Sequence, residues 1–302
     1  MKKTCLLLLV LVATLSFAHA GDNPVKNPYS HHYDFKDFTA LSVSNAFQVD
    51  FAFADTWSVD VTVPDFIQPY LKVNRLGDKV KIGLDKLPHD IQRKLGDLKD
   101  PLQATVRMPK LLSLSLSGAS RLQADGIQEL HGETMVIELS GASRVNALNV
   151  RSDGALNLGL SGASRATLTA EVKLLDIDLS GASHANLSGQ SKKLKLDCSG
   201  ASNCKLEGDF ENADIDLSGS SSASVDGDTR ILKIEQSGAS RFESSGETAS
   251  AYTELSGASK ARLTVKEKLH YELSGASTLR VRNLGASITG EQSRGCKLSF
   301  DR

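Results

Sequence analysis

Apolar and polar positions alternate along most of the second half of the chain. The stretch Leu194-Lys195-Leu196-Asp197 shows the pattern, with every second residue apolar. A period of two predicts β-strands that bury one face, whereas a helix would place apolar residues three and four apart. Residues 113–302 are therefore expected to form strands.

The alternation is interrupted at regular intervals by the tetrapeptide Ser-Gly-Ala-Ser, which occurs once as Ser-Gly-Ser-Ser. Its nine copies begin at Ser117, Ser140, Ser161, Ser180, Ser199, Ser218, Ser237, Ser256 and Ser274. From Ser161 to Ser256 the intervals are all equal. A fixed period of roughly 19 residues is typical of a solenoid, in which each repeat packs on its neighbours.

Each repeat reads as a strand, the tetrapeptide, a second strand and a turn. Such units cannot bury their apolar faces alone, so equivalent strands are expected to stack about 4.8 Å apart in parallel ladders. Parallel crossover connections are nearly always right-handed. The sequence thus predicts an all-β fold, a right-handed parallel β-helix of about nine regular coils of roughly 19 residues.

The tetrapeptide is interpreted as scaffold. If the alternation continues through it, its glycine and its second serine face inward, where a larger side chain would collide with adjacent coils. The serine column could then carry hydrogen bonds from coil to coil. A catalytic serine is needed only once and requires a base. The column comprises Ser120, Ser143, Ser164, Ser183, Ser202, Ser221, Ser240, Ser259 and Ser277.

The first twenty residues predict a cleaved signal peptide. Lys2 and Lys3 precede an apolar run at residues 6–15, and Ala18-His19-Ala20 forms a cleavage site. Cys5 lies before the apolar run, so the chain is not predicted to be a lipoprotein. No later apolar run approaches the roughly 20 residues that span a bilayer. We therefore expect an exported protein, periplasmic, cell-surface or secreted, with no transmembrane segment in the mature chain.

Residues 21–112 lack the repeat and are expected to form capping, opening coils before the repetitive region and C-terminal cap at residues 113–302. Ten of the 16 aromatic residues lie between Tyr29 and Tyr70. Strand-like stretches occupy residues 41–43, 47–53, 59–63, 71–73 and 80–84, and residues 88–101 suit a short helix or a loop. A solenoid needs such an irregular end to cover its first apolar layer.

Composition adds few constraints. The chain of 302 residues has 35 Lys and Arg against 36 Asp and Glu, so no net charge favours nucleic acid as a partner. Cys198, Cys204 and Cys296 remain after cleavage, and a disulfide between two of them is possible without being required. Their spacing fits no zinc motif.

Several blocks carry a family resemblance. FTALSVSNAFQVDF, WSVDVTVPDFIQPYLKV, DKVKIGL and VRMPKLLSLSLSGASRL begin at residues 38, 57, 78 and 106. Over roughly residues 35–290 the chain resembles the putative auto-transporter adhesin head GIN domain family. The resemblance implies a right-handed parallel β-helix with an adhesin role, and it supplies no catalytic residues.

One outward position is acidic on six consecutive coils. Divalent cations such as calcium could relieve the repulsion between carboxylates about 4.8 Å apart. Two residues upstream, however, the column reads Asp176, Lys195, Asp214, Lys233, so lysines could neutralise the acids. We favour this solvated pattern over a metal site. The acidic residues are Asp178, Asp197, Asp216, Glu235, Glu254 and Glu272.

A basic column follows the tetrapeptide. It could bind sulfated or carboxylated glycans, or it could pair with acids and keep the surface soluble. Its candidates for surface binding are Arg121, Arg144, Arg165, Arg241 and Lys260, with His184, Asn203 and Ser222 on the coils between.

Catalysis is not predicted. The interval between tetrapeptides barely changes from Ser161 to Ser274, which leaves no long loops to wall an active-site cleft. The chain also lacks H-E-x-x-H, P-loop and nucleophile-elbow motifs. We expect no cofactor and a binding or adhesion module that contacts a glycan or protein through its ladder faces. An envelope protein that self-assembles is the alternative, and a polysaccharide-acting enzyme is less favoured.

Overall fold

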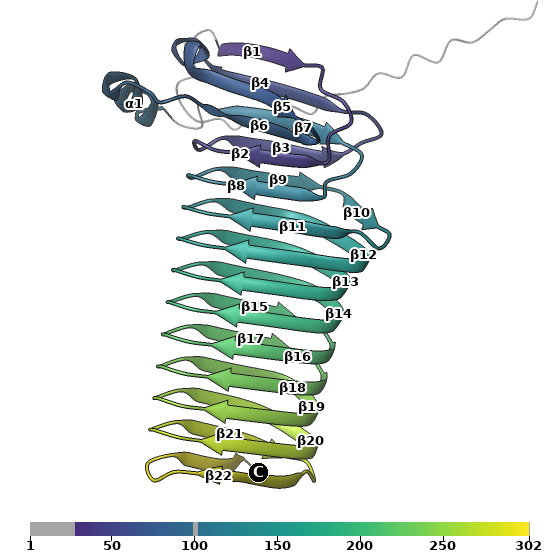
Figure 1. Ribbon diagram of the computed structural model, residues 1–302, viewed down its shortest axis with the longest axis vertical. Coiled ribbons are helices and arrows are strands. Elements are labelled where there is room, and N and C mark those ends of the chain that lie inside the picture. The colour runs from purple at the N-terminus through teal and green to yellow at the C-terminus, as the bar shows by residue number, and fades with distance from the viewer. Residues whose placement is uncertain (1–27, 99–101, 302) are drawn as a thin grey trace, which may run out of the picture.

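The computed structural model describes residues 28–98 and 102–301 of the chain. Within these residues the protein is an elongated β-solenoid of about ten turns (Figure 1). The predicted all-β solenoid is confirmed, with about ten turns in place of nine. The turn that follows the ninth tetrapeptide is Ser293-Arg294-Gly295-Cys296, which lacks the repeated sequence. The predicted signal peptide at residues 1–20 lies outside the described residues.

Two parallel sheets face each other across the core. In each coil one strand segment precedes the tetrapeptide and belongs to the first sheet, and one follows it and belongs to the second. Thus β16 (Phe210–Leu217) pairs with β14 (His184–Cys198) and β18 (Thr229–Gln236), while β17 (Ser222–Asp226) pairs with β15 (Asn203–Glu207) and β19 (Arg241–Leu255). All of these pairings are parallel, as the stacking of coils requires.

The remaining strands of the repetitive region continue both sheets toward its two ends. They are β8 (Ser113–Leu116), β9 (Arg121–Asp125), β10 (Ile127–Leu130), β11 (Thr134–Leu139), β12 (Arg144–Leu160), β13 (Arg165–Leu179), β20 (Lys260–Leu273), β21 (Thr278–Asn283), β22 (Ser287–Gln292) and β23 (Lys297–Asp301). In β12, β13, β14, β19 and β20 the chain rounds the bend from the second sheet to the first without a break in the strand. This bend lies at the edge opposite the tetrapeptides (Figure 1).

A single apolar core runs along the solenoid axis. Leu194 and Leu196 are fully buried, while Lys195 between them is exposed, as the alternation predicts. Equivalent positions of successive coils stack, so each apolar side chain packs against the coils above and below. Removal of this apolar surface from water stabilises coils that could not fold alone.

The N-terminal end is built from seven strands, a 3-10 turn and one helix. The five strand-like stretches predicted there correspond to β2–β6. The elements are β1 (Pro28–Tyr33), β2 (Ala40–Val43), β3 (Gln48–Phe53), β4 (Ser58–Pro64), η1 (Asp65–Tyr70), β5 (Leu71–Leu76), β6 (Lys79–Leu84), α1 (His89–Gly96) and β7 (Gln103–Met108). The helix α1 lies in the charged segment for which the sequence left a helix or a loop open.

The order of the opening coils in space differs from their order in the chain. The coil of β2 and β3 lies between the later strands β6 and β7 on one side and β8 and β9 on the other. Beyond β7, the strands β4 and β1 add to the second sheet in antiparallel pairings. Antiparallel strands at this end interrupt the stacking of equivalent coils.

The prediction that the tetrapeptide glycine faces inward is wrong. In Ser199-Gly200-Ala201-Ser202 the glycine and alanine are exposed at a two-residue turn, and only the second serine points into the core. Gly200 has φ +69°, and positive φ at the first central residue only is the pattern of a type II′ turn. The turn takes two residues out of the alternation, so the glycine lies on the outer edge.

The three cysteines of the described residues carry free thiols. Cys198 and Cys204 are buried, and burial raises the pKa of the Cys198 thiol to about 12. The disulfide that the sequence left open is therefore not formed among Cys198, Cys204 and Cys296.

Candidate binding site

The serine column is buried at the inner side of each tetrapeptide turn. Ser120, Ser143 and Ser164 donate to the carbonyl oxygen of the first serine of their own turns, at 2.9, 2.8 and 2.6 Å. Ser202 and Ser221 instead reach a carbonyl oxygen of the preceding coil, at 3.4 and 3.3 Å. Ser183 does the same at 3.5 Å, and the Ser240 hydroxyl lies 3.3 Å from the side-chain amide of Gln236. These hydroxyls bond to the scaffold, whereas the buried Oγ of Ser259, in the same column, forms no hydrogen bond with any described residue.

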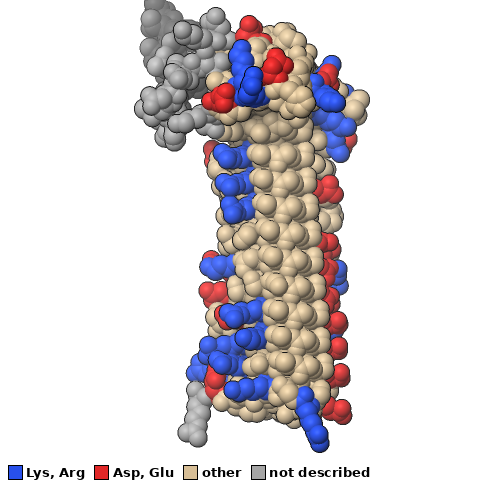
Figure 2. All heavy atoms as spheres, turned by 90° about the vertical axis from the view of Figure 1, so that its left-hand side faces the viewer, with Lys and Arg blue, Asp and Glu red and all other residues tan. Residues whose placement is uncertain are grey.

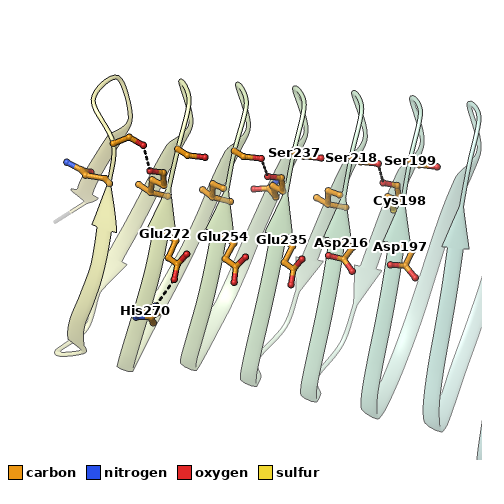
Figure 3. Close-up of a pocket in the computed structure, with 18 of the residues that line it drawn as sticks. Asp197, Cys198, Ser199, Asp216, Ser218, Glu235, Ser237, Glu254, His270 and Glu272 are labelled. Carbon is orange, nitrogen blue, oxygen red and sulfur yellow. Dashed lines mark hydrogen bonds and ion pairs between the residues drawn. The ribbon is translucent and has the colours of Figure 1, made fainter.

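The acidic column runs along the outer face of the first sheet, beside the tetrapeptide edge (Figure 3). Its members are in register from Asp178 through Glu272 and continue to Glu291, which the sequence reading missed. The column and the adjacent serines line a shallow groove of about 850 Å³.

Neighbouring bases neutralise part of the acidic column. Lys195 contacts Asp197 at 2.5 Å, Lys233 contacts Glu235, and His270 lies 3.5 Å from Glu272. Partial burial, together with Glu235 and Asp197, raises the pKa of Asp216. Among residues 28–98 and 102–301, no three or more His, Cys, Asp or Glu side chains group in a way that could hold a metal ion.

The basic column lies on the outer face of the second sheet, across the tetrapeptide edge from the acids. Figure 2 shows this edge as a stripe that is uncharged over most of its length, with mostly basic side chains on its left and mostly acidic side chains on its right. In the register of neighbouring strands, Arg121 lies beside Arg144, Arg144 beside Arg165, and Arg241 beside Lys260. None of the five predicted bases makes an ion pair with another described residue.

A second groove, of about 1030 Å³, lies at the bend opposite the tetrapeptides. We call it the bend groove. Its floor is a column of buried residues in register across the coils, and its lining extends from Arg151 to Lys266. The floor consists of Ser152, Val172, Ser191, Phe210 and Thr229, and Thr248 continues the same column.

Most acidic side chains of the bend groove form a hydrogen bond to the backbone or an ion pair within the protein. Asp209 accepts the backbone N–H of Asp228 at 2.8 Å, and Asp228 accepts that of Glu247 at 2.8 Å. Glu247 also pairs with Lys266, and Glu171 pairs with Arg151 at 3.0 Å. A backbone N–H orients a carboxylate without supplying a positive charge, so Asp209 and Asp228 have no ion-pair partner among the described residues.

Three basic side chains of the bend groove have no such partner. Lys173, Lys192 and Arg230 occupy equivalent outward positions on three coils, and none forms an ion pair within the described part of the chain. Arg230 bonds only to the neutral side chain of Asn212, at 3.2 Å. The lining as a whole holds five bases and six acids, so the groove carries no excess of positive charge, and these three bases stand out only because no acid pairs with them.

Hydroxyl groups of the floor are also left without partners. The side-chain oxygens of Ser191, Thr229 and Thr248 are buried and form no hydrogen bond with any described residue. Buried polar groups are nearly always hydrogen-bonded, so this column departs from the usual pattern of a core.

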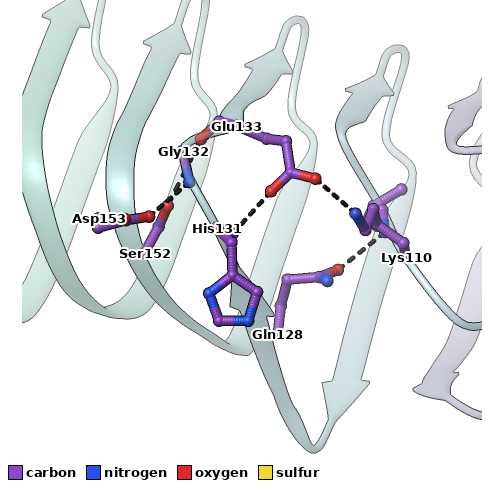
Figure 4. A network of polar contacts seen from close by, with 8 residues as sticks. Lys110, Gln128, His131, Gly132, Glu133, Ser152 and Asp153 are labelled. Atoms are coloured by element: carbon purple, nitrogen blue, oxygen red, sulfur yellow. Dashed lines mark hydrogen bonds and ion pairs between the residues drawn. The ribbon is translucent and has the colours of Figure 1, made fainter.

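A polar network fixes the end of the bend groove nearest the N-terminus (Figure 4). Glu133 accepts from Lys110 at 2.5 Å and from the backbone N–H of His131 at 2.7 Å. These two bonds lower the pKa of Glu133. Asp153, which lines the groove, accepts the backbone N–H of Gly132. The first lining coil is thereby held to the coil before it.

The bend groove was missed because its floor residues share no residue type. The wall of the groove does carry a sequence signal, because one acidic or amide residue recurs there once per coil. These residues are Glu171, Gln190, Asp209, Asp228 and Glu247. An acidic or amide residue at a constant offset from each tetrapeptide could have identified a second outward column.

Comparisons with known proteins agree with this architecture. The model of the family described as putative auto-transporter adhesin, head GIN domain, matches residues 37–192 and 148–284. None of the curated proteins matches the sequence. No helix in residues 28–98 and 102–301 combines the length and apolar character needed to cross a membrane.

Three solved structures illustrate the similarity. A putative adhesin from Parabacteroides distasonis is 13% identical over 91% of this chain and 97% of its own, with a TM-score of 0.50. A putative adhesin from Parabacteroides merdae is 13% identical over 91% and 96%, with a TM-score of 0.47. A putative lipid binding protein from P. distasonis is 13% identical over 91% and 97%, also at 0.47. At this identity the first of them supports the fold, and the matched residues show that the chain belongs to the putative auto-transporter adhesin head GIN domain family.

Proposed function

We propose that this protein is an exported, non-catalytic adhesion module that binds an extended acidic glycan in the bend groove. Membership of an adhesin family supports an adhesion-type role and a surface location. Export, the bend groove as the binding site and an acidic glycan as the ligand are our own proposals beyond family membership.

The repetition of the groove favours a linear polymer as the ligand. Each coil adds an equivalent set of wall and floor positions about 4.8 Å farther along the axis. Successive units of an extended chain could therefore meet similar surroundings, whereas a compact ligand would use only one or two coils. Gln190 and Glu211, both at the groove wall, could bond to sugar hydroxyls.

The unpaired bases carry the proposal. Lys173, Lys192 and Arg230 line the groove without acidic partners, while most of the lining acids bond to backbone or to other bases. A ligand with carboxylate or sulfate groups could form short-range, charge-assisted hydrogen bonds with these three side chains. This pattern favours an acidic glycan over a neutral one.

The same contacts argue against glycoside hydrolysis. A glycosidase places two available carboxyl groups on either side of the scissile bond. Asp209 and Asp228 instead accept main-chain N–H groups, and Glu171 and Glu247 are held by bases. The groove is better suited to holding a polymer than to cleaving it.

The test compares two variants that each lose three positive charges. K173Q/K192Q/R230Q removes the free bases of the bend groove, and R121Q/R144Q/R165Q removes three bases from the opposite edge. Binding to polygalacturonate, alginate and hyaluronan is measured by calorimetry, with dextran as a neutral control. We expect at least one acidic polymer to bind, with affinity falling as salt rises, and the groove variant to bind at least about tenfold more weakly while the edge variant retains binding.

Two results would contradict the proposal. The first is equal loss of binding in both variants, which would indicate attraction to overall charge. The second is binding of dextran as strong as that of every acidic polymer, which would remove the role of the free bases.

A further inference from the structure

The tetrapeptide edge is flat and uncharged over its nine tetrapeptide turns, and the exposed Arg294 of the following turn ends it. We use this name for the exposed glycine and alanine positions of the turns, such as Gly200 and Ala201. Apart from Ser220, neither position carries a side chain beyond Cβ in the nine tetrapeptide turns, which at about 4.8 Å each extend the edge over roughly 43 Å. A second surface could approach its backbone closely along this whole length (Figure 2).

Columns of opposite charge border the edge on its two sides. The second sheet presents its bases on one side, and the first sheet presents its acids on the other. Several members on both sides, including Arg144, Lys260 and Glu254, form no ion pair within the described part of the chain. Like charges stacked in a column repel each other, so each column would be stabilised by an opposite column placed against it.

We propose that two copies of this chain associate through their tetrapeptide edges, with their solenoid axes parallel and a two-fold axis running between them. A half-turn about an axis parallel to the solenoid moves the basic column of one copy onto the side of the acidic column of the other. This happens on both sides of the interface at once. The edge is therefore complementary to itself, as a two-fold interface requires.

The charges also distinguish this arrangement from its alternative. A half-turn about an axis that crosses the edge from one sheet to the other would pack the copies head to tail, with bases against bases and acids against acids. Like-charge contacts suppress such association. A two-fold axis parallel to the solenoids also forbids a shift of one copy along the other. Each coil therefore faces the same coil of the second copy.

Same-coil pairs then join oppositely charged residues. Glu138 shares its coil with Arg144, Glu254 with Lys260, and Glu291 with Lys297, each pair lying before and after one turn. In the proposed dimer each of these acids faces the paired base of the second copy. The middle coils contribute fewer attractions, since Asn203 and Ser222 are neutral, and the last coil adds one repulsion, because Arg294 of one copy faces Arg294 of the other.

The size of the edge predicts a weak, salt-sensitive dimer. Packed sheets lie about 10 Å apart, so a strip of about 43 Å offers roughly 430 Å² per copy before the flanking side chains are counted. A total of about 860 Å² is below the usual size of stable specific interfaces, which fits a weak association. Exposed ion pairs are screened by salt, so dissociation should follow ionic strength.

The first experiment measures association of the purified chain by sedimentation at several concentrations, in about 50 mM and about 500 mM NaCl, between which the Debye length falls severalfold. We expect a monomer–dimer equilibrium whose dissociation constant rises at least about tenfold at the higher salt. A chain that remains monomeric at low salt and millimolar concentration would overturn the proposal.

Two charge-reversal variants supply the decisive control. R144E/K260E/K297E makes the basic column acidic, and E138K/E254K/E291K makes the acidic column basic. Each variant alone should be monomeric, because like columns then face each other, whereas an equimolar mixture should form a heterodimer with opposite columns on both sides. Recovery in the mixture cannot arise from misfolding, and no recovery would refute the interface.

A single cysteine tests the orientation. In a C296S background, A142C lies near one end of the edge, far from A276C near the other end. The parallel dimer places the introduced cysteine of one copy next to the same cysteine of the other copy. A142C alone should therefore form an intermolecular disulfide. Cross-linking that occurs only when A142C and A276C are mixed would show the head-to-tail arrangement and overturn the proposal.

Discussion

At the scale of single residues, the tetrapeptide glycine is required by the approach of adjacent coils. A Cβ on Gly200 would lie 2.7 Å from the carbonyl oxygen of Gly181, and the residue has φ +69°. Ala201 donates its N–H to that same oxygen at 2.8 Å. The hydrogen bond holds neighbouring turns so close that no side chain fits at the glycine.

We predict that Gly200→Ala destabilises the protein by about 2–4 kcal/mol, because it combines left-handed strain with a backbone clash. Gly77→Ala is the matched control, since Gly77 has φ +64° and open space around its Cβ position. It should cost about 1 kcal/mol. Urea denaturation of both variants measures the difference, and equal costs would show that the stacking of turns is not responsible.

The inward serine of each turn was predictable, whereas the direction of the glycine was not. Alternation places Leu196 and Cys198 inside, and counting onward at period two places Gly200 inside as well. The count fails because Gly200 and Ala201 form a turn. The sequence contains no residue that marks this interruption, since glycine is compatible with a narrow interior and with positive φ alike.

At the scale of a column or coil, the acidic column combines repulsion with partial compensation. Asp216 lies between Asp197 and Glu235, and burial together with these two carboxylates raises its pKa. A raised pKa means that the folded state disfavours the ionised form. Protonation of Asp216 therefore adds to the stability of the folded state at low pH. This contribution is lost as pH rises through the folded-state pKa of Asp216.

We predict that Asp216→Asn raises the melting temperature at pH 7.5 by about 1–2 °C, the shift expected for a few tenths of a kcal/mol. The difference from the unmodified chain should shrink as pH falls and Asp216 becomes protonated. Thermal melts at pH 7.5 and 4.5 measure this trend. Glu243→Gln, an exposed carboxylate on the opposite sheet, should show no such gain. A lower melting temperature for Asp216→Asn at pH 7.5 would contradict the account.

The arrangement of the opening coils could not be read from the chain. The strand stretches of residues 41–84 were identifiable by alternation, but nothing local indicates that β2 and β3 insert between β6–β7 and β8–β9. Pairing between segments distant in sequence depends on which apolar faces match in three dimensions. The bend groove was missed for a related reason, since Val172, Ser191 and Phe210 share a position without sharing a chemistry.

At the scale of the whole molecule, two long surfaces on opposite edges serve different proposed roles. The tetrapeptide edge is self-complementary in charge, and the bend groove carries unpaired bases. Association through the first surface would leave two copies of the second facing outward. A dimer could then hold one polymer at two places, which strengthens attachment without additional contacts in either groove.

The central claim is that the protein acts as an adhesion module outside the cell. The most direct measurement treats intact and lysed cells of the producing organism with protease and follows the chain by antibody, with a cytoplasmic protein as the control for lysis. We predict digestion of the chain in intact cells while the control survives. Protection of the chain until the envelope is broken would contradict the claim.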